Sequence, residues 1–154
     1  MTINNQNRAA WIKLFYYVFV FLYLATTIFL IYLQVKPIYP IVGAISGFVF
    51  ACIVISLSLN LNYIIYQESE QKIILRYYPL HPFHQKFKSI EIPKSQLSHF
   101  DLKRKLFGFR PEVTLYQQTE RGLAKYPSVS IASLSKSSQA EMIKSLQKNS
   151  MKKQ

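Results

Sequence analysis

The chain has 154 residues, half of them apolar, and its 19 lysine and arginine residues against seven acidic residues give a net charge of +12. This length allows one modest domain plus membrane anchors and excludes two large domains. The only cysteine, Cys52, lies in an apolar run, so no intrachain disulfide forms and the chain is not a secreted cysteine scaffold.

Charge is distributed very unevenly along the chain. All seven acidic residues and sixteen of the 19 basic residues follow position 67. We therefore expect an almost uncharged first part and, from about residue 60, a soluble part with a net charge near +9 (sixteen basic minus seven acidic residues).

Two uncharged apolar runs follow an N-terminal tail at residues 1–13, and they extend over Leu14–Leu33 and Ile41–Leu59. Twenty helical residues span roughly 30 Å, the thickness of a bilayer core. Pro37 and Pro40 stop helix propagation between the runs, and so short a link forces the second helix to return antiparallel. The sequence predicts a transmembrane helical hairpin over residues 14–59. A cleaved signal peptide is disfavoured because the first run is too long and a second span follows at once.

Positive charges near the ends of the runs predict the orientation of this hairpin. Arg8 and Lys13 precede the first run, Lys36 stands alone at the tip, and many basic residues follow the second run. Both termini are therefore expected to be cytoplasmic, with the hairpin in the cytoplasmic (inner) membrane.

Small residues recur every four positions in the second run, at Gly43, Gly47 and Ala51. This spacing places them on one helical face and lets another helix approach closely. We expect the face to pack against the first helix of the hairpin, and homodimerisation through the same face is the alternative.

After residue 60 the apolar residues alternate with polar ones in short runs, as is typical of strands. The expected strands are Asn62–Tyr66, Lys72–Tyr78, Gln85–Ile92, Leu97–Leu102, Glu112–Gln117 and Tyr126–Ser133. Ser138 and Glu141 have the spacing of a capping box, which predicts the start of a C-terminal helix. The fold class expected for residues 60–148 is α+β, with six or seven strands in a curved sheet or partly open barrel that the helix closes. Residues 149–154 are expected to be a basic tail.

Four short motifs in this second part form a recognisable series. They are Ile90–Pro93, Ser95–Leu97, Leu106–Gly108 and Val113–Tyr116. With the two preceding spans, they make residues 62–148 resemble the PH-like domain of small bacterial membrane proteins. The resemblance implies a PH-like barrel with a C-terminal helix, and a role in scaffolding or membrane-associated binding.

Residue types that carry catalysis are sparse. The sequence has no nucleophile elbow, phosphate loop or dinucleotide fingerprint, so we expect a non-enzymatic protein without a cofactor. His81, His84, His99 and Asp101 offer possible ligands for a divalent metal. Histidines three apart in a proline-rich turn are more often ordinary surface residues, and no metal site is predicted.

Cations interleaved with aromatic side chains form the most informative feature of the soluble part. They are Lys103, Arg104, Lys105, Phe107, Phe109 and Arg110, with Lys86 and Lys88 expected on a neighbouring strand. Because the domain is tethered to a bilayer, its basic face meets anionic headgroups before any other polyanion. The alternative is a solvated charged hairpin with two buried aromatic rings. Nucleic-acid binding is not expected, since no recognition fold is evident.

The sequence thus predicts a membrane-anchored binding or scaffold protein whose basic domain contacts anionic lipid headgroups or a partner membrane protein. The alternative function is an accessory, assembly or immunity factor that acts on a larger membrane complex through the hairpin.

Overall fold

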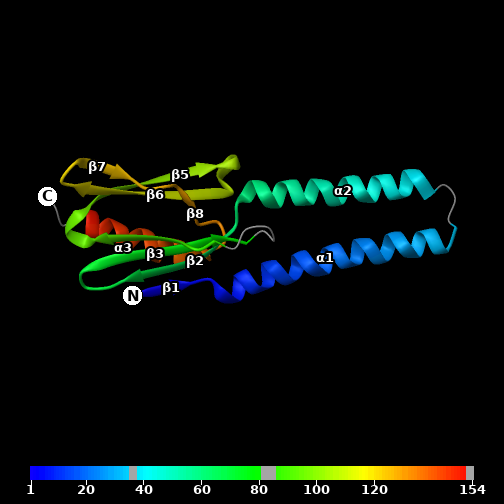
Figure 1. The fold of residues 1–154 in the computed structure, drawn as a ribbon, viewed down its shortest axis with the longest axis horizontal. Helices are drawn as coiled ribbons and strands as arrows, with labels where there is room; N and C mark the ends of the chain where they lie inside the picture. Colours follow the sequence, from blue (N-terminus) through cyan, green and yellow to red (C-terminus); the bar gives the residue numbers. More distant parts are fainter. Residues whose placement is uncertain (35–37, 81–85, 152–154) are drawn as a thin grey trace.

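Two long helices lead into a sheet-rich domain in the computed structural model, which describes residues 1–34, 38–80 and 86–151 (Figure 1). The helices α1 (Gln6–Tyr32) and α2 (Ile38–Leu59) run antiparallel and extend away from the domain. Both are long and apolar enough to cross a membrane, and the rest of the chain covers almost none of their surface. The core helix of a soluble protein would be mostly covered, so this exposure supports association with a membrane.

Both helices begin earlier than the apolar runs. Helix α1 starts at Gln6 and has 27 residues, a length of about 40 Å. Helix α2 starts at Ile38, so that Pro40 lies in its first turn. Proline is tolerated there because the first N–H groups of a helix have no intrahelical partner.

Two antiparallel sheets make up the domain. The first has the order β1 (Thr2–Asn4), β2 (Asn62–Glu68), β3 (Lys72–Pro79) and β4 (Lys88–Pro93). In the second, β5 (Leu97–Lys105), β6 (Arg110–Thr119) and β7 (Gly122–Lys125) are neighbours in that order, and β8 (Val129–Ser130) also pairs with β6. Short 3₁₀ turns, Lys94–Gln96 and Leu106–Gly108, precede and follow β5.

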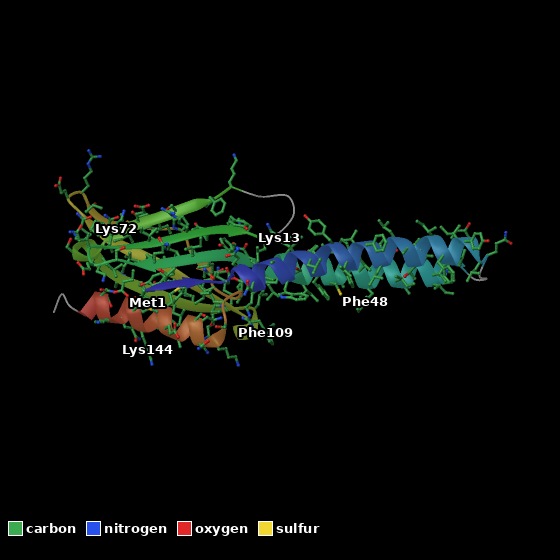
Figure 2. The ribbon with its side chains drawn as sticks, turned by 90° about the horizontal axis from the view of Figure 1, so that it is seen from below. Met1, Lys13, Phe48, Lys72, Phe109 and Lys144 are labelled. Atoms are coloured by element: carbon green, nitrogen blue, oxygen red, sulfur yellow. The ribbon has the colours of Figure 1, made fainter. Side chains whose placement is uncertain are left out.

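The C-terminal helix α3 (Lys136–Met151) closes the opening between the sheets (Figures 1 and 2). Its Met142 and Leu146 are fully buried in a core to which both sheets contribute. The fully buried side chains include Ile64, Tyr66, Ile73, Leu75, Ile92, Leu97, Leu115, Ile131 and Leu134. The predicted order of two apolar helices, a sheet-rich domain and a closing helix is therefore confirmed.

The first residues are not a separate tail. Strand β1 adds an edge to the first sheet by pairing with β2, and the Met1 ammonium donates a hydrogen bond to the Glu68 carbonyl at 2.9 Å. Three residues are too few to show an alternating pattern, so the sequence does not reveal this strand. The pairing places the N-terminus and the domain at the same end of the helical hairpin (Figure 1).

The start of α3 also differs from the prediction. The Ser138 N–H donates to the Ser135 hydroxyl at 3.0 Å, which makes Ser135 the capping residue and places the helix start three residues earlier. The helix then continues to Met151, into the segment predicted as a basic tail.

The small-residue face of α2 does not lie against α1. Gly43, Gly47 and Ala51 are exposed, and a Cβ added at either glycine would meet nothing within 4 Å. The hairpin contact includes instead a 2.8 Å hydrogen bond between the hydroxyls of Tyr23 and Ser46. Since α2 is apolar on all sides, its sequence pattern does not specify which face meets α1.

Candidate functional site

One end of the domain, which we call the helix end, lies where α1 and α2 emerge; the opposite end is the far end (Figure 1). The turn between β5 and β6 belongs to the helix end. Its Arg110 donates a hydrogen bond from Nη1 to the carbonyl of Ser58, in the last turn of α2, at 3.0 Å. This contact fixes the β5–β6 turn beside the point where α2 enters the domain.

Apolar side chains project from this turn into solvent. The exposed fraction is 103% for Phe107, 75% for Phe109 and 41% for Leu106. We call residues 103–110 the basic tip. The aromatic rings predicted as buried under the alternative interpretation are thus the most outward-facing part of the domain.

The backbone of the basic tip is costly for these residue types. Leu106 and Phe107 have φ angles of 50° and 55°, in the left-handed region, and Gly108 follows with a φ of 95°. Tight hairpin turns usually place asparagine and glycine in such conformations, because bulky side chains are strained there. Leu106 and Phe107 are both exposed, so burial in the domain does little to offset this backbone strain. Strained, exposed apolar residues of this kind point to a role outside the fold.

Positive charge surrounds these apolar residues. Lys103, Arg104 and Lys105 are all exposed, because the last residues of β5 extend beyond the core and neither face of the strand is covered. The buried Glu112 pairs with the ammonium of Lys105 at 2.9 Å and with the guanidinium of Arg110 at 2.7 Å. Glu112 thereby holds two of the cations in place across the turn.

Lys86 and Lys88 do not lie next to this cluster. Lys88 begins β4, which belongs to the other sheet, so the prediction of a neighbouring strand is wrong. Both lysines and the intervening Phe87 are nevertheless exposed. They lie beside the helix end, because Phe87 packs against Tyr78 with ring centroids 4.5 Å apart, and the Lys13 ammonium of α1 lies 5.0 Å from the centre of the same Tyr78 ring. They form a second basic and aromatic group at the same end.

Three of the seven acidic residues lie at the far end. Glu68 and Glu70 flank the β2–β3 turn and Glu120 lies in the β6–β7 turn, both at the far end. Glu112 is close to the helix end, but its charge is matched by its two partners. The far end therefore carries both signs of charge, since Arg121 and Lys148 lie there too, whereas the charged residues of the basic tip are all positive.

Glu68 anchors α3 at the far end. Although burial acts to raise its pKa, hydrogen bonds from Lys94, Ser145 and Asn149 lower the pKa of Glu68 to about 2. The hydroxyls of Tyr66 and Ser145 are 2.6 Å apart, and burial of the ring is the main reason that the pKa of Tyr66 rises to about 12. These groups stabilise the domain and lie far from the basic tip.

The possible metal ligands are not assembled in the described ranges. His99 stacks on Tyr116 at 4.2 Å, and Asp101 accepts a hydrogen bond from the Tyr116 hydroxyl at 3.1 Å. Within residues 1–34, 38–80 and 86–151, no three His, Cys, Asp or Glu side chains come together as a metal site would need. His81 and His84 lie outside the described residues.

No family model, curated protein or solved structure matches this chain. The helix end, with its basic tip, is therefore the part of the described structure that points to a function.

Proposed function

We propose that the chain is a non-enzymatic, membrane-anchored binding protein whose basic tip contacts anionic lipid headgroups. The observation that carries this proposal is the basic tip itself, in which strained and exposed apolar residues are flanked by cations beside the end of α2. In this proposal α1 and α2 span the bilayer, and the soluble domain is PH-like. Two four-stranded antiparallel sheets with a closing C-terminal helix support that fold assignment.

The position of the basic tip relative to α2 supports contact with the bilayer surface. Ser58 is in the last turn of an apolar helix of 22 residues, a length that matches a hydrocarbon core. The end of such a helix lies at the headgroup level, and the bond from Arg110 to Ser58 brings the basic tip to the same level. Phe107 and Phe109 then enter the interface, where aromatic rings are favoured.

Charge provides the preference for anionic lipid. A lysine or arginine close to an anionic leaflet contributes about 1 kcal/mol, and the contribution fades within a Debye length. Lys103 and Arg104 make no ion pair within the described ranges, so their charge is available to a headgroup. Because basic segments are favoured on the cytoplasmic side of a membrane, the proposal places the basic domain on the cytoplasmic side of the inner membrane. Both termini are then cytoplasmic, since strand β1 keeps the N-terminus beside the domain.

A second candidate function is favoured by the exposed face of α2. Gly43 and Gly47 have open space around them and would let a helix of a partner membrane protein, or of a second copy, approach closely. An accessory or assembly factor would use such a face. It is secondary because no feature of the soluble domain depends on it.

Hydrogen exchange on the full chain in nanodiscs tests the lipid contact. We expect amides 103–110 to exchange more slowly in discs that contain anionic lipid than in purely zwitterionic discs, and to lose this protection at high salt. Amides in the β6–β7 turn at residues 119–122 serve as an internal control at the far end.

Charge reversal sharpens this test. Lys103→Glu with Arg104→Glu should reduce the lipid-dependent protection by up to about 30-fold, which corresponds to about 1 kcal/mol for each cation. The matched control, Arg121→Glu with Lys148→Glu, changes the net charge equally on exposed residues of the β6–β7 turn and α3. Equal protection in both kinds of disc, or equal effects of the two double variants, would refute the lipid contact.

A further inference from the structure

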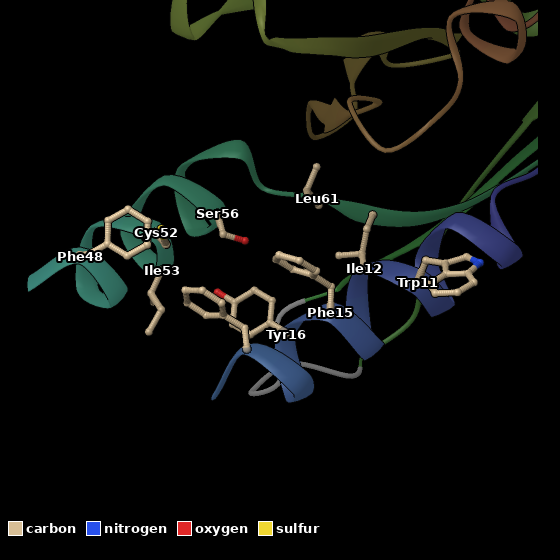
Figure 3. A pocket seen from close by; sticks show the side chains of 10 residues that line it. Trp11, Ile12, Phe15, Tyr16, Phe48, Cys52, Ile53, Ser56 and Leu61 are labelled. Atoms are coloured by element: carbon tan, nitrogen blue, oxygen red, sulfur yellow. The ribbon is translucent and has the colours of Figure 1, made fainter. Parts of the chain in front are cut away.

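An apolar cleft lies between α1 and α2 immediately below the domain (Figure 3). Its volume is about 580 Å³. The walls are Trp11, Phe15 and Phe19 from α1, and Phe48, Cys52 and Ser56 from α2. Figure 3 shows Phe15 of α1 on the side of the space that faces Ser56 of α2.

The cleft is bounded at both ends. Toward the domain it ends at Leu61, in the link between α2 and β2. Toward the tip of the hairpin, the hydroxyls of Tyr23 and Ser46 join the helices, four residues beyond Phe19 in α1 and two residues beyond Phe48 in α2. Between these two points the helices diverge toward the domain (Figure 1). The space is thus a defined site at the depth of one leaflet, in the proposed orientation.

We propose that this cleft holds one acyl chain of an anionic phospholipid. This inference rests on the proposed function for the headgroup charge, and on the shape and lining of the cleft for the chain. A bilayer supplies hydrocarbon chains to any apolar space that opens at this depth, and the walls offer them aromatic and aliphatic contacts.

The size of the cleft suits a lipid chain. Its volume of about 580 Å³ is typical of small-molecule sites. A flexible, unbranched acyl chain can follow such a space between two helices.

Charges near the cleft favour a lipid with an anionic headgroup. The bond from Arg110 to the carbonyl of Ser58 holds the basic tip, with its exposed Lys103 and Arg104, at the end of α2, the helix that forms one wall of the cleft. Lys13 stands on α1 between the wall residues Ile12 and Phe15 in sequence, with its ammonium over Tyr78. In Figure 2, Phe48 of the cleft and Phe109 of the basic tip project on the same side of the molecule. A lipid whose chain enters the cleft therefore has its headgroup close to the helix end, with its cations.

The chain contains its own reporter of occupancy. Trp11 is the only tryptophan of the 154 residues and lines the cleft. We would reconstitute the full chain in vesicles of equal parts phosphatidylglycerol and phosphatidylcholine, with acyl-chain bromines on one lipid or on the other. Bromines quench tryptophan only at short range, so the difference between the two preparations reports which lipid lies next to Trp11.

The expected result is an association constant for the anionic lipid at least about fivefold above that for phosphatidylcholine, as one cation near a headgroup provides. Ser56→Phe, which fills the cleft, should abolish this preference, and Cys52→Phe is a second variant with the same purpose. Val54→Phe is the matched control, because Val54 is exposed on the same helix and does not line the cleft.

Equal quenching by the two brominated lipids in the wild-type chain would overturn this inference, as would a preference that persists in both filled variants. That failure is separate from failure of the proposed function, since amides 103–110 can respond to anionic lipid while Trp11 shows no preference. In the opposite case the amides do not respond, but Trp11 of the wild-type chain shows a preference for anionic lipid that the two filled variants lose. The lipid site is then supported and the lipid contact of the basic tip is refuted.

Discussion

Asn5 joins the helical hairpin to the domain, and its removal is expected to be the most damaging polar substitution at the helix end. The side chain is 5% exposed. Its Oδ1 accepts the Ile64 N–H at 2.8 Å, and its Nδ2 donates to the Asn62 carbonyl and to the Ser133 hydroxyl, each at 2.9 Å. One side chain thus connects the start of α1 to β2 and to the segment before α3.

The cost of Asn5→Ala follows from the groups left without partners. Asn4 is the last β1 residue in the β1–β2 ladder, so the Asn5 side chain supplies the acceptor for the next amide, that of the fully buried Ile64. A buried N–H without an acceptor costs about 1–3 kcal/mol, and the loss of the two donated bonds adds about 1 kcal/mol. Since the Asn62 carbonyl keeps its bond from Ser133, we expect a total of about 2–4 kcal/mol.

Unfolding of the full chain in detergent micelles measures this cost, and hydrogen exchange of the Ile64 amide locates it. We expect Asn5→Ala to lower the midpoint of thermal unfolding of the domain by about 10 °C or more, with faster exchange at Ile64. Asn4→Ala is the matched control, because Asn4 is adjacent and exposed. If the two variants lower the midpoint equally, or if the Ile64 amide remains protected without Asn5, the reasoning is wrong.

Three further predictions concern other parts of the molecule. The pKa of Glu68 in the folded chain is about 2, below its ordinary value of 4.5, so the stability that Glu68 contributes is present above about pH 5 and is lost as the pH falls toward 2. Glu68→Gln should lack this contribution, about 1–2 kcal/mol after allowance for solvent screening, already at pH 7, and chemical unfolding as a function of pH measures it. Gly47→Ala should leave the thermal midpoint of the hairpin in detergent unchanged or slightly raised, because the new methyl group meets nothing within 4 Å and alanine favours helix; a fall of several degrees would mean that the face packs on α1 after all. Phe107→Gly should raise the free energy of unfolding by up to about 1 kcal/mol, since glycine relieves the strain at a φ of 55°, while the lipid-dependent protection of the basic tip falls; a variant that is destabilised would show that Phe107 serves the fold.

The sequence predicts well those elements that carry a long or regular pattern. Uncharged apolar runs of about twenty residues identify α1 and α2, because so long a run without charge is typical of one continuous apolar helix. Alternation identifies β2, whose side chains are buried at every second position. Their β-branched and aromatic residues identify β3 and β6, in which three and four consecutive side chains are buried. The basic tip is found in the same way, because cations and aromatic residues are adjacent in the chain.

Features that depend on distant partners are not visible in the sequence. Strand β1 exists because Thr2–Asn4 meets β2 more than sixty residues away, and Asn5 has its role for the same reason. The small residues Gly43 and Gly47 of α2 face outward although their spacing suits the hairpin contact. The cleft at Trp11 arises from two helices together and has no signature in either one.

The depth of residue 107 in a bilayer tests the central claim most directly. A fluorophore on Phe107→Cys, with Cys52→Ser to leave a single thiol, is compared with one on Arg121→Cys in the β6–β7 turn, both in vesicles that contain anionic lipid. We predict that quenchers carried by the lipids reach the label at 107 and not the label at 121, and that aqueous iodide shows the reverse order. A label at 107 that iodide quenches as fully as the label at 121 would contradict the claim that the basic tip contacts the membrane.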